Sequence, residues 1–371
     1  MNKMNKFIAG LAIAGFTFGL TACGDDSSST SAKEPDLAIS GVVFGSDGKS
    51  GELRWMDKEG NISDKKGLSF NQDSKVFLNK GEIYVAEEFG ADNLSKVDPE
   101  KIETEGKKAV LWQISFDENA NPVDMAFDGE NVWVALQNAD SLVLLSTADG
   151  KQVKSIKTTE FSKGNEASPY VKEIELKDGK LYAIFDRYYY DVEANKLVYP
   201  KGLLAIYDAS TGKLKDTVQL ATPNPSAMAF VKEGLIVATH GDYNEDYGSD
   251  ADNARGIEKV DLKNLKSELI VDGKALGGGV YMFAAEDGVA YAAINKVWGD
   301  IPLMKVDLAA KKTEKIAGVK NASGSLFVKD GTLYIGERVT DGEKVLVYKD
   351  GKLSSLEQPK GALPPYSIAL F

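Results

Sequence analysis

The amino-acid sequence predicts an all-β protein: a seven-bladed β-propeller of four-stranded antiparallel blades, closed by the C-terminal strand, which completes the N-terminal blade. Three features support this prediction. A glycine turn followed by a short apolar strand recurs along the chain. Each copy belongs to a unit of four short strands, and the two ends of the chain each hold part of one further unit.

The recurring turn joins two strand-forming segments, as in "FDGENVWVA" and "KDGKLYAI". Glycine after Asp or Lys favours a hairpin because glycine adopts a positive φ at little cost. The six copies lie at Gly81, Gly129, Gly179, Gly234, Gly288 and Gly331, with spacings of 48, 50, 55, 54 and 43 residues. This spacing is typical of a repeat architecture.

Further strands surround each turn, so that one unit contains four. An apolar stretch precedes the turn, and a third and a fourth strand follow it, as in "LLAIYDASTGK" and "KLKDTVQL". Such units favour a β-propeller, because radial repetition leaves few open sheet edges. A two-sheet sandwich does not explain the regular hairpins, and almost no segment shows the apolar period of a helical solenoid.

A repeated phrase predicts how the ring closes. "NPVDMAF" (residues 121–127) and "NPSAMAF" (residues 224–230) lead into inner strands, and the C-terminal "PPYSIALF" (residues 364–371) repeats them loosely. The N-terminal stretch of residues 42–62 holds the second, third and fourth strands of a blade without a first. We therefore expect the C-terminal strand to supply it, since an open ring would leave unpaired edges.

The N-terminus predicts export and lipid anchoring. Lys3 and Lys6 precede an apolar run over residues 7–20, which is typical of a signal peptide and short of the roughly 20 residues that span a bilayer. "LTAC" resembles the bacterial lipobox, which implies a lipid-modified Cys23. We expect a signal peptide over residues 1–22, a lipidated cysteine and flexible tether over residues 23–36, and the propeller over residues 37–371.

Charge and cysteine content narrow the function further. The net charge of −12 argues against nucleic-acid binding, because phosphate contacts rely on clustered Lys and Arg. Cys23 is the single cysteine, so the fold has no intramolecular disulfide and depends on its core. We expect a monomer attached to the outer membrane through its anchor, on the periplasmic or the cell-surface side.

Polar residues near the ends of the second strands are candidate ligand-binding residues. In a propeller these positions surround the mouth of the central channel, so their side chains could form a polar ring. The candidates are Glu88, Gln137, Arg187, His240, Asn295 and Arg338. His240 is the single histidine, which excludes a metal site built from several histidines.

Two long loops offer further candidates, since long loops within compact repeats are often functional. Residues 185–202 contain Tyr188, Tyr189 and Tyr190, and residues 240–256 contain Tyr243. Trp298 could join them from the next blade. These aromatic side chains suit stacking on a sugar, a planar cofactor or a protein. Alternatively, the tyrosines pack onto the propeller and the insertion forms an additional hairpin.

The second long loop is also acidic. Carboxylate oxygens are ligands that Ca²⁺ prefers, so Ca²⁺ is a candidate cofactor. The loop lacks the glycine and the later glutamate of a calcium-binding loop, which favours a solvated acidic loop instead. The acidic residues are Asp242, Glu245, Asp246, Asp250 and Asp252.

Three segments resemble a known family. "IYVAEEFGADNLSKVDPE" (residues 83–100), residues 132–153 and residues 203–220 are similar to the repeats of YVTN-type, YncE-like seven-bladed propellers, which are WD40-like in architecture. The resemblance covers most of the chain after the tether. It implies the fold and no particular activity, because one fold carries many functions.

We expect a non-catalytic binding protein of the envelope or cell surface. The fold and anchor resemble surface propellers that capture cobalamin for an outer-membrane transporter, which implies a corrinoid-like or glycan-like nutrient as the ligand. One alternative is a protein-interaction scaffold of the envelope. Another is a calcium-dependent, lactonase-like hydrolase, with Glu88, Asn138 and Asn295 as candidate ligands. The sequence leaves open whether the protein is an enzyme.

Overall fold

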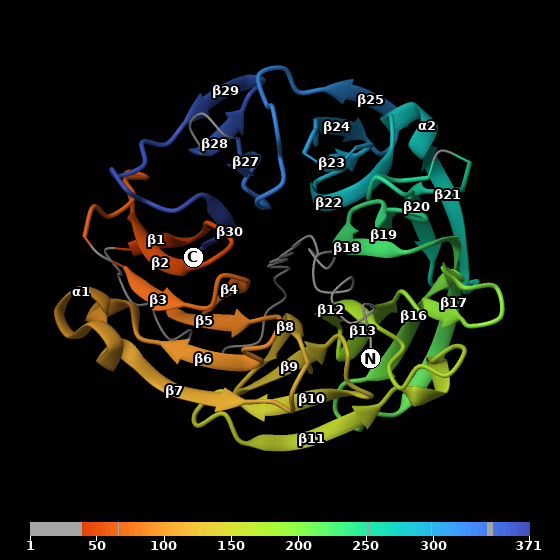
Figure 1. Ribbon diagram of the computed structural model, residues 1–371, viewed down its shortest axis with the longest axis horizontal. Coiled ribbons are helices and arrows are strands. Elements are labelled where there is room, and N and C mark those ends of the chain that lie inside the picture. The colour runs from red at the N-terminus through yellow and green to blue at the C-terminus, as the bar shows by residue number, and fades with distance from the viewer. Residues whose placement is uncertain (1–38, 66, 251, 298, 340–343) are drawn as a thin grey trace, which may run out of the picture.

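Seven four-stranded antiparallel sheets form a ring in the computed structural model (Figure 1). The structure describes residues 39–371 except 66, 251, 298 and 340–343. The predicted seven-bladed propeller is therefore confirmed. The predicted signal peptide, Cys23 and the tether lie outside the described residues.

Each blade places one strand at the centre of the ring and the other three progressively outward (Figure 1). We number the blades from 1, which both chain ends share, to 7. Their inner strands are β30 (Pro365–Leu370), β4 (Ser74–Asn79), β8 (Pro122–Asp128), β12 (Val171–Lys177), β18 (Pro225–Val231), β22 (Gly279–Glu286) and β26 (Leu326–Lys329). Each inner strand contacts the inner strand of the next blade, so the ring is continuous.

The remaining strands follow in antiparallel order within each blade. The second strands are β1 (Ile39–Ser46), β5 (Glu82–Glu87), β9 (Asn131–Leu136), β13 (Lys180–Phe185), β19 (Gly234–Thr239), β23 (Val289–Asn295) and β27 (Thr332–Glu337). The third strands are β2 (Gly51–Asp57), β6 (Asn93–Val97), β10 (Ser141–Ser146), β16 (Lys201–Asp208), β20 (Gly256–Asp261), β24 (Leu303–Asp307) and β28 (Lys344–Lys349). The outer strands are β3 (Leu68–Phe70), β7 (Val110–Ser115), β11 (Gln152–Lys157), β17 (Leu214–Pro223), β21 (Lys266–Asp272), β25 (Lys312–Lys315) and β29 (Lys352–Ser355).

Short elements fill the connections between blades and strands. The insertion in blade 4 forms a separate two-stranded hairpin, β14 (Tyr189–Asp191) with β15 (Lys196–Val198). This is the additional hairpin that the sequence left as an alternative. The helical turns are η3 (Pro99–Lys101), α1 (Ile102–Glu105), η4 (Gly106–Ala109), η5 (Thr159–Phe161) and α2 (Gly273–Leu276). Among the described residues, no helix is long and apolar enough to span a membrane.

Blade 1 is closed by the C-terminal strand, as predicted. β30 pairs with β1, with Val42 opposite Ala369 and Val43 opposite Ile368. One detail of the prediction is wrong: the outer strand of this blade is β3, which begins at Leu68, beyond the predicted stretch. Ile62 makes only an isolated bridge to Met56, so the chain continues past residue 62 before it pairs again.

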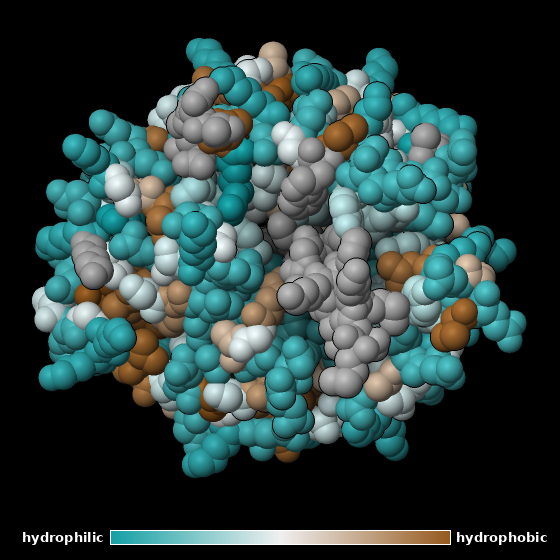
Figure 2. Space-filling view, in the orientation of Figure 1, coloured by the Kyte–Doolittle hydropathy of each residue, from teal (hydrophilic) through white to brown (hydrophobic). Residues whose placement is uncertain are grey.

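The hydrophobic core lies in the seams between blades. Side chains alternate between the two faces of a strand, so each blade presents one apolar set to each neighbour. In the seam between blades 3 and 4, for example, Trp133 of β9 and Phe185 of β13 are fully buried in one cluster. The face seen in Figure 2 is covered mostly by hydrophilic residues, with hydrophobic ones in small separate areas.

Polar side chains of the inner strands also link one blade to the next. From blade 1 to blade 2, the Ser367 hydroxyl accepts a hydrogen bond from the Val76 amide at 3.1 Å. From blade 3 to blade 4, an Asp124 carboxylate oxygen accepts from the Ile174 amide at 2.7 Å. These bonds satisfy backbone N–H groups on the free edge of the inner strands, which have a partner strand on one side only. They also help to hold neighbouring blades in a fixed orientation.

The repeated phrase begins the inner strands for a backbone reason. Asn121 and Asn224 have φ values of 57° and 52°, in the left-handed region that Asn tolerates. The Asn121 side-chain amide donates to the Gln137 side chain at 2.7 Å, and the Asn224 amide donates to the Gly241 carbonyl at 2.9 Å. The proline that follows is the first residue of the strand, where its missing N–H is tolerated.

Candidate functional site

The predicted polar residues after the second strands lie at one end of the ring, which we call the entry end. There the second strands stop and the inner strands begin. In five blades, the backbone N–H of the residue just past the second strand donates to a carbonyl that precedes the inner strand, directly in blades 2 to 5 and within the preceding loop in blade 7. These donors are Glu88, Gln137, Asp186, His240 and Arg338, and their acceptors are Asp73, Asn121, Tyr170, Asn224 and Asn321.

β-Bulges redirect one residue near the start of five inner strands at this end, the second residue in four of them and the third in β22. In each case one residue of the inner strand pairs with no residue of the second strand. This residue lies outside the ladder, and the direction of its side chain changes. The bulged residues are Tyr366, Val123, Lys172, Ser226 and Tyr281. The bulges therefore help to place Lys172 and Tyr366 among the polar residues of the entry end.

Glu88 and Lys75 form a buried ion pair. The Lys75 Nζ atom lies 2.9 Å from Glu88 Oε1, and the two side chains are 2% and 0% exposed. Burial raises the pKa of Glu88 to about 7, although the nearby Lys75 charge opposes the shift. Glu88 Oε2 is buried and has no hydrogen-bond partner among the described residues. This carboxylate oxygen remains able to accept a hydrogen bond.

Asp186 occupies the matching position of blade 4. Its Oδ2 atom lies 3.5 Å from Lys172 Nζ, and its buried Oδ1 atom has no hydrogen-bond partner within the described part of the chain. Burial raises the pKa of Asp186 to about 6, against the Lys172 charge and with a smaller contribution from Asp242.

Arg187, the residue predicted for the ring in blade 4, lies one residue past the matching position. Asp186 rather than Arg187 makes the recurring bond at this position. The Arg187 Nε donates instead to the Phe161 carbonyl at 3.1 Å, so its side chain supports a neighbouring loop.

Arg338 and Tyr366 contact each other where blades 7 and 1 meet. The guanidinium carbon of Arg338 lies 5.4 Å from the centre of the Tyr366 ring, which is a cation–π contact. Arg338 Nη1 and the Tyr366 hydroxyl are buried without hydrogen-bond partners in the described structure. Burial raises the pKa of Tyr366 well above its usual value, and the nearby Glu88 adds to the shift. The groups of blades 7, 1 and 2 thus lie close together.

His240 is held by hydrogen bonds rather than left open for chemistry. Its Nδ1 atom lies 3.0 Å from the Gly241 carbonyl, and its Nε2 atom lies 3.2 Å from Asn295 Nδ2. Burial lowers the pKa of His240 to about 4, so the ring is neutral at neutral pH. A neutral ring that donates from Nδ1 and accepts at Nε2 satisfies both contacts. Asn295 Oδ1, in contrast, is buried without a hydrogen-bond partner among the described residues.

These residues form a set that we call the axial polar cluster, because they come from the inner strands, the loops beside them and the end of the second strand β23. Its members are Lys75, Glu88, Lys172, Asp186, Asn295, Arg338 and Tyr366. The cluster carries both charges, and its unpartnered atoms include more hydrogen-bond acceptors than donors. It is suited to holding a polar molecule.

Aromatic rings border the cluster on blades 4 and 5. Tyr170 and Tyr188 stack at 3.9 Å between ring centres, Tyr188 and Tyr199 lie 6.0 Å apart, and Tyr199 and Tyr243 lie 6.1 Å apart. Tyr243 then stacks on His240 at 4.0 Å. We call these four tyrosines the tyrosine ladder. Burial, and next the charges around them, raise the pKa of each, and Asp186 is one of those charges in all four cases.

Three other predicted residues that the structure describes do not belong to the cluster. Tyr189 and Tyr190 lie in the hairpin strand β14, where the Tyr190 hydroxyl donates to Asn195. Gln137 accepts from Asn121 through its side chain and from Ser168 through its carbonyl at 2.7 Å, so it ties loops together. Trp298 lies outside the described residues.

The structure gives the calcium hypothesis no support. Among the residues that it describes, no group of three or more His, Cys, Asp or Glu side chains could hold a metal ion. In the acidic loop, the Asn253 side-chain amide donates to Asp242 and to Asp250, each at 3.1 Å, so these carboxylates hold the loop itself together.

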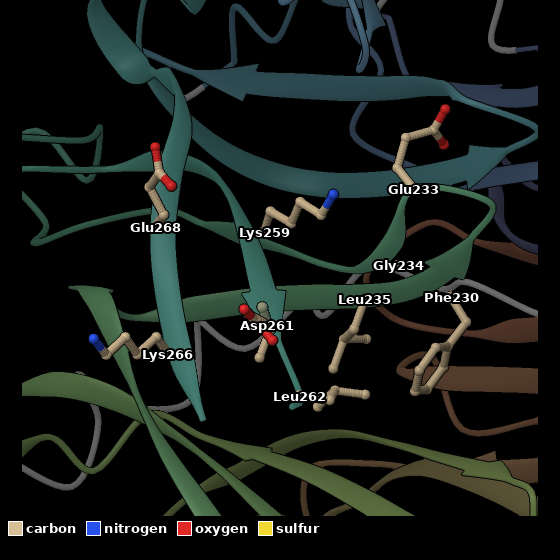
Figure 3. Close-up of a pocket in the computed structure, with 10 residues that line it drawn as sticks. Phe230, Glu233, Gly234, Leu235, Lys259, Asp261, Leu262, Lys266 and Glu268 are labelled. Carbon is tan, nitrogen blue, oxygen red and sulfur yellow. The ribbon is translucent and has the colours of Figure 1, made fainter. Parts of the chain in front are cut away.

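A hollow of about 610 Å³ lies away from the cluster, at the outer part of blade 5 (Figure 3). The turn at Gly234 that borders it joins an inner strand to a second strand, so it belongs to the end opposite the entry end. Phe230, Leu235 and Leu262 line one side of it (Figure 3). Of the charged residues that line it, Lys259, Asp261, Lys266 and Glu268 are exposed, and Glu233 is partly buried. We favour the axial polar cluster as the candidate site, because it brings together several buried polar atoms that have no hydrogen-bond partner among the described residues.

Comparisons with known proteins support the fold alone. No family model matches the chain, and no curated protein shows significant similarity to it. The chain is similar to the crystal structure of the computationally designed Ika8 protein, with 13% identity, a TM-score of 0.52, and coverage of 90% of this chain and 92% of that one. It is also similar to the dihydro-heme d1 dehydrogenase NirN in complex with DHE, with 15% identity, a TM-score of 0.51, and coverage of 92% and 76%.

Four members of the cluster were not predicted from the sequence: Lys75, Lys172, Asp186 and Tyr366. Lys172 and Tyr366 are both the second residue of an inner strand, and Lys75 holds the same position without a bulge. In β30 the bulge directly follows the proline that begins the strand, so this proline is a sequence signal from which Tyr366 could have been predicted. No comparable signal marks Lys172.

Proposed function

We propose that the protein is a non-catalytic binding protein that holds a small polar ligand in the axial polar cluster. The observation that supports this proposal is the set of buried polar atoms without partners at the entry end. An unpartnered buried polar group costs about 1–3 kcal/mol, so hydrogen bonds from a ligand would offset that cost. These atoms are Glu88 Oε2, Asp186 Oδ1, Asn295 Oδ1, Arg338 Nη1 and the Tyr366 hydroxyl.

Binding is a better explanation of the cluster than catalysis. Both ring nitrogens of His240 are in contact with hydrogen-bonding groups, so this side chain does not offer a free base. Glu88 has a pKa near neutrality, which an acid–base catalyst needs, but Lys75 holds one of its oxygens in an ion pair. The scaffold and the calcium-dependent hydrolase remain alternatives that no contact of the described residues favours.

The setting of this function is also part of the proposal. We propose a YncE-like propeller that is exported, anchored by a lipid on Cys23, and attached to the outer membrane on its periplasmic or cell-surface side. There it would capture a corrinoid-like or glycan-like nutrient for an outer-membrane transporter. The signal-peptide pattern, the "LTAC" motif and the three repeat segments support this setting.

Thermal unfolding of the purified full chain tests the binding function. Corrinoids, neutral sugars and divalent cations are added one class at a time at millimolar concentration. We expect one class to raise the melting temperature by a few degrees, because a ligand that binds only the folded state stabilises it. Glu88→Gln is expected to reduce this shift, whereas Asp216→Asn, an exposed position on β17, keeps it. An unchanged melting temperature with every class would refute ligand capture as stated.

Membrane fractionation tests the anchor. In the wild type we expect the protein in the outer-membrane fraction, because two or more acyl chains bind a bilayer stably. Cys23→Ser removes the only thiol that could carry the lipid, and we expect the protein in the soluble fraction. Ser27→Cys in the Cys23→Ser background is the matched control, since a thiol outside the motif should not restore attachment. Outer-membrane attachment of Cys23→Ser would contradict the lipid anchor.

A further inference from the structure

Asp186 is the group at the entry end whose surroundings define a ligand most closely. Its Oδ2 atom lies at the long distance of 3.5 Å from Lys172 Nζ, and its Oδ1 atom is buried without a partner among the residues the structure describes. Its backbone N–H donates to the Tyr170 carbonyl at 3.0 Å, so its main chain is fixed. A carboxylate and an ammonium group thus lie next to each other. Their separation of 3.5 Å is long for an ion pair, so each can still form a hydrogen bond with a ligand.

The tyrosine ladder lies beside this pair. Its rings form a continuous row from Tyr170 through Tyr188 and Tyr199 to Tyr243. Each of the four residues is partly exposed, so the ladder is not closed off in the interior of a blade. Exposed aromatic surface next to fixed polar groups suits a ligand with one apolar side and one polar edge.

The charges around the site favour an uncharged ligand, because a charged group would meet a like charge there. An anion would meet Asp186 and Asp242, whose Oδ1 atoms are both buried without partners in the described structure. A cation would meet Lys172, which already lies beside Asp186. His240 adds no charge, because its pKa is lowered to about 4. An uncharged ligand avoids both repulsions.

Hydroxyl groups match the hydrogen-bond donors and acceptors that this site offers. A hydroxyl both donates and accepts, so one hydroxyl could donate to Asp186 Oδ1 while its neighbour accepts from Lys172. Asn295 Oδ1 and Arg338 Nη1 offer a second acceptor and a second donor in the same cluster. A pyranose ring combines adjacent hydroxyls with an apolar face of C–H groups.

We propose that the ligand is an uncharged sugar, bound by adjacent hydroxyls to the Lys172–Asp186 pair and packed with its apolar face against the tyrosine ladder. This inference depends on the proposed binding function and names its ligand class. The corrinoid alternative then fails for this site. Glu88 Oε2, which is also buried without a partner among the described residues, offers the sugar a further acceptor.

Isothermal titration calorimetry with the purified full chain tests the inference. The probes are neutral mono- and oligosaccharides of glucose, mannose, xylose and N-acetylglucosamine, with glucuronate, choline and hydroxocobalamin as charged and corrinoid comparisons. We expect binding of at least one neutral sugar and no binding of glucuronate or choline. Asp186→Asn is expected to weaken sugar binding about ten- to hundredfold, because it removes a charged acceptor. Tyr188→Leu is expected to weaken it about two- to tenfold, since it removes an aromatic surface and keeps an apolar side chain.

Asp216→Asn is the matched control, because this aspartate is exposed on the outer strand β17. Circular dichroism of each variant verifies that it is folded. If hydroxocobalamin binds and no sugar does, the sugar inference is wrong and the binding function stands. If a sugar binds with equal affinity to Asp186→Asn and the wild type, the assigned site is wrong. If no probe binds, this inference and the proposed function fail together.

Discussion

Deletion of residues 366–371 is expected to lower the melting temperature by at least about 10 °C. These residues form nearly all of β30, and Tyr366, Ile368, Ala369 and Leu370 are 6%, 2%, 2% and 9% exposed. Each large apolar side chain that loses its burial costs about 1.5–3 kcal/mol. The sum is comparable with the whole stability of a typical domain, about 5–15 kcal/mol.

The position of β30 in the ring increases the loss of stability that we expect from this deletion. The strand pairs with β1 in its own blade and contacts β26 of blade 7 and β4 of blade 2. The Ser367 hydroxyl accepts from the Val76 amide, and the Phe371 amide donates to the Ser40 carbonyl at 2.9 Å. Its removal therefore opens two seams and exposes the edge of β1. An exposed edge strand also promotes aggregation.

Thermal unfolding followed by circular dichroism measures the change. The matched control is Ser367→Ala, which keeps the strand and removes one hydrogen bond, so it should cost only about 1 kcal/mol. A peptide with the sequence of residues 365–371, added in trans, is expected to recover part of the lost melting temperature by strand addition. An unchanged melt of the shortened chain would show that β30 does not hold the ring together.

The fold was predictable because its signals are local and repeated. A glycine at a hairpin turn needs only its neighbours to be recognised, and six copies set the number of complete units. The ring closure followed from a missing first strand at one end and an extra strand at the other. The outer strand β3 was misplaced because three residues, Leu68 to Phe70, carry almost no periodic signal.

The candidate site was predictable only in part, because its geometry depends on register and bulges. The end of β13 is set by the pairing of Phe185 with Leu203, which lies on the far side of the insertion. The sequence of the insertion gives no sign of that pairing, so Arg187 was chosen in place of Asp186. Lys172 joins the site because the ladder between Val171 and Glu173 is shifted by one residue. Such a shift cannot be read from alternation alone.

The buried polar groups also show how the site and the fold compete. An apolar residue at the position of Glu88 would avoid the cost of desolvating a carboxylate, and the raised pKa of Glu88 reflects that cost. Charged residues at buried positions are typical of functional sites, where residues that lower the stability of the fold are kept for their function. The stability of single and double variants can therefore measure what the site costs the fold.

Lys75→Met is expected to destabilise the protein by about 3–5 kcal/mol at pH 8, because it leaves the buried Glu88 carboxylate without its ion-pair partner. It also removes the hydrogen bond from Lys75 Nζ to the Val123 carbonyl at 3.0 Å, which links blades 2 and 3. Urea unfolding measures the free energy of unfolding.

The penalty is expected to depend on pH with a definite sign. Burial raises the pKa of Glu88 in the folded protein to about 7, above its ordinary value of 4.5, so the folded state binds more protons between these values. Stability from this group therefore falls as the pH rises from about 4.5 to 7. Without the Lys75 charge, the folded pKa rises further and the fall extends to higher pH. Lys75→Met should thus cost less at pH 5 than at pH 8.

The double variant Lys75→Met with Glu88→Gln separates the ion pair from the packing around it. Both charges are removed, so we expect a stability closer to the wild type than that of Lys75→Met, with little change between pH 5 and pH 8 from this pair. The exposed pair Lys151 with Asp149, at 2.6 Å and with side chains 82% and 44% exposed, is the matched control. Lys151→Met should leave the unfolding free energy unchanged within error, because solvent screens exposed ion pairs. If Lys75→Met and Lys151→Met cost the same, Glu88 is not a buried charge that depends on Lys75, and the axial polar cluster loses its electrostatic basis.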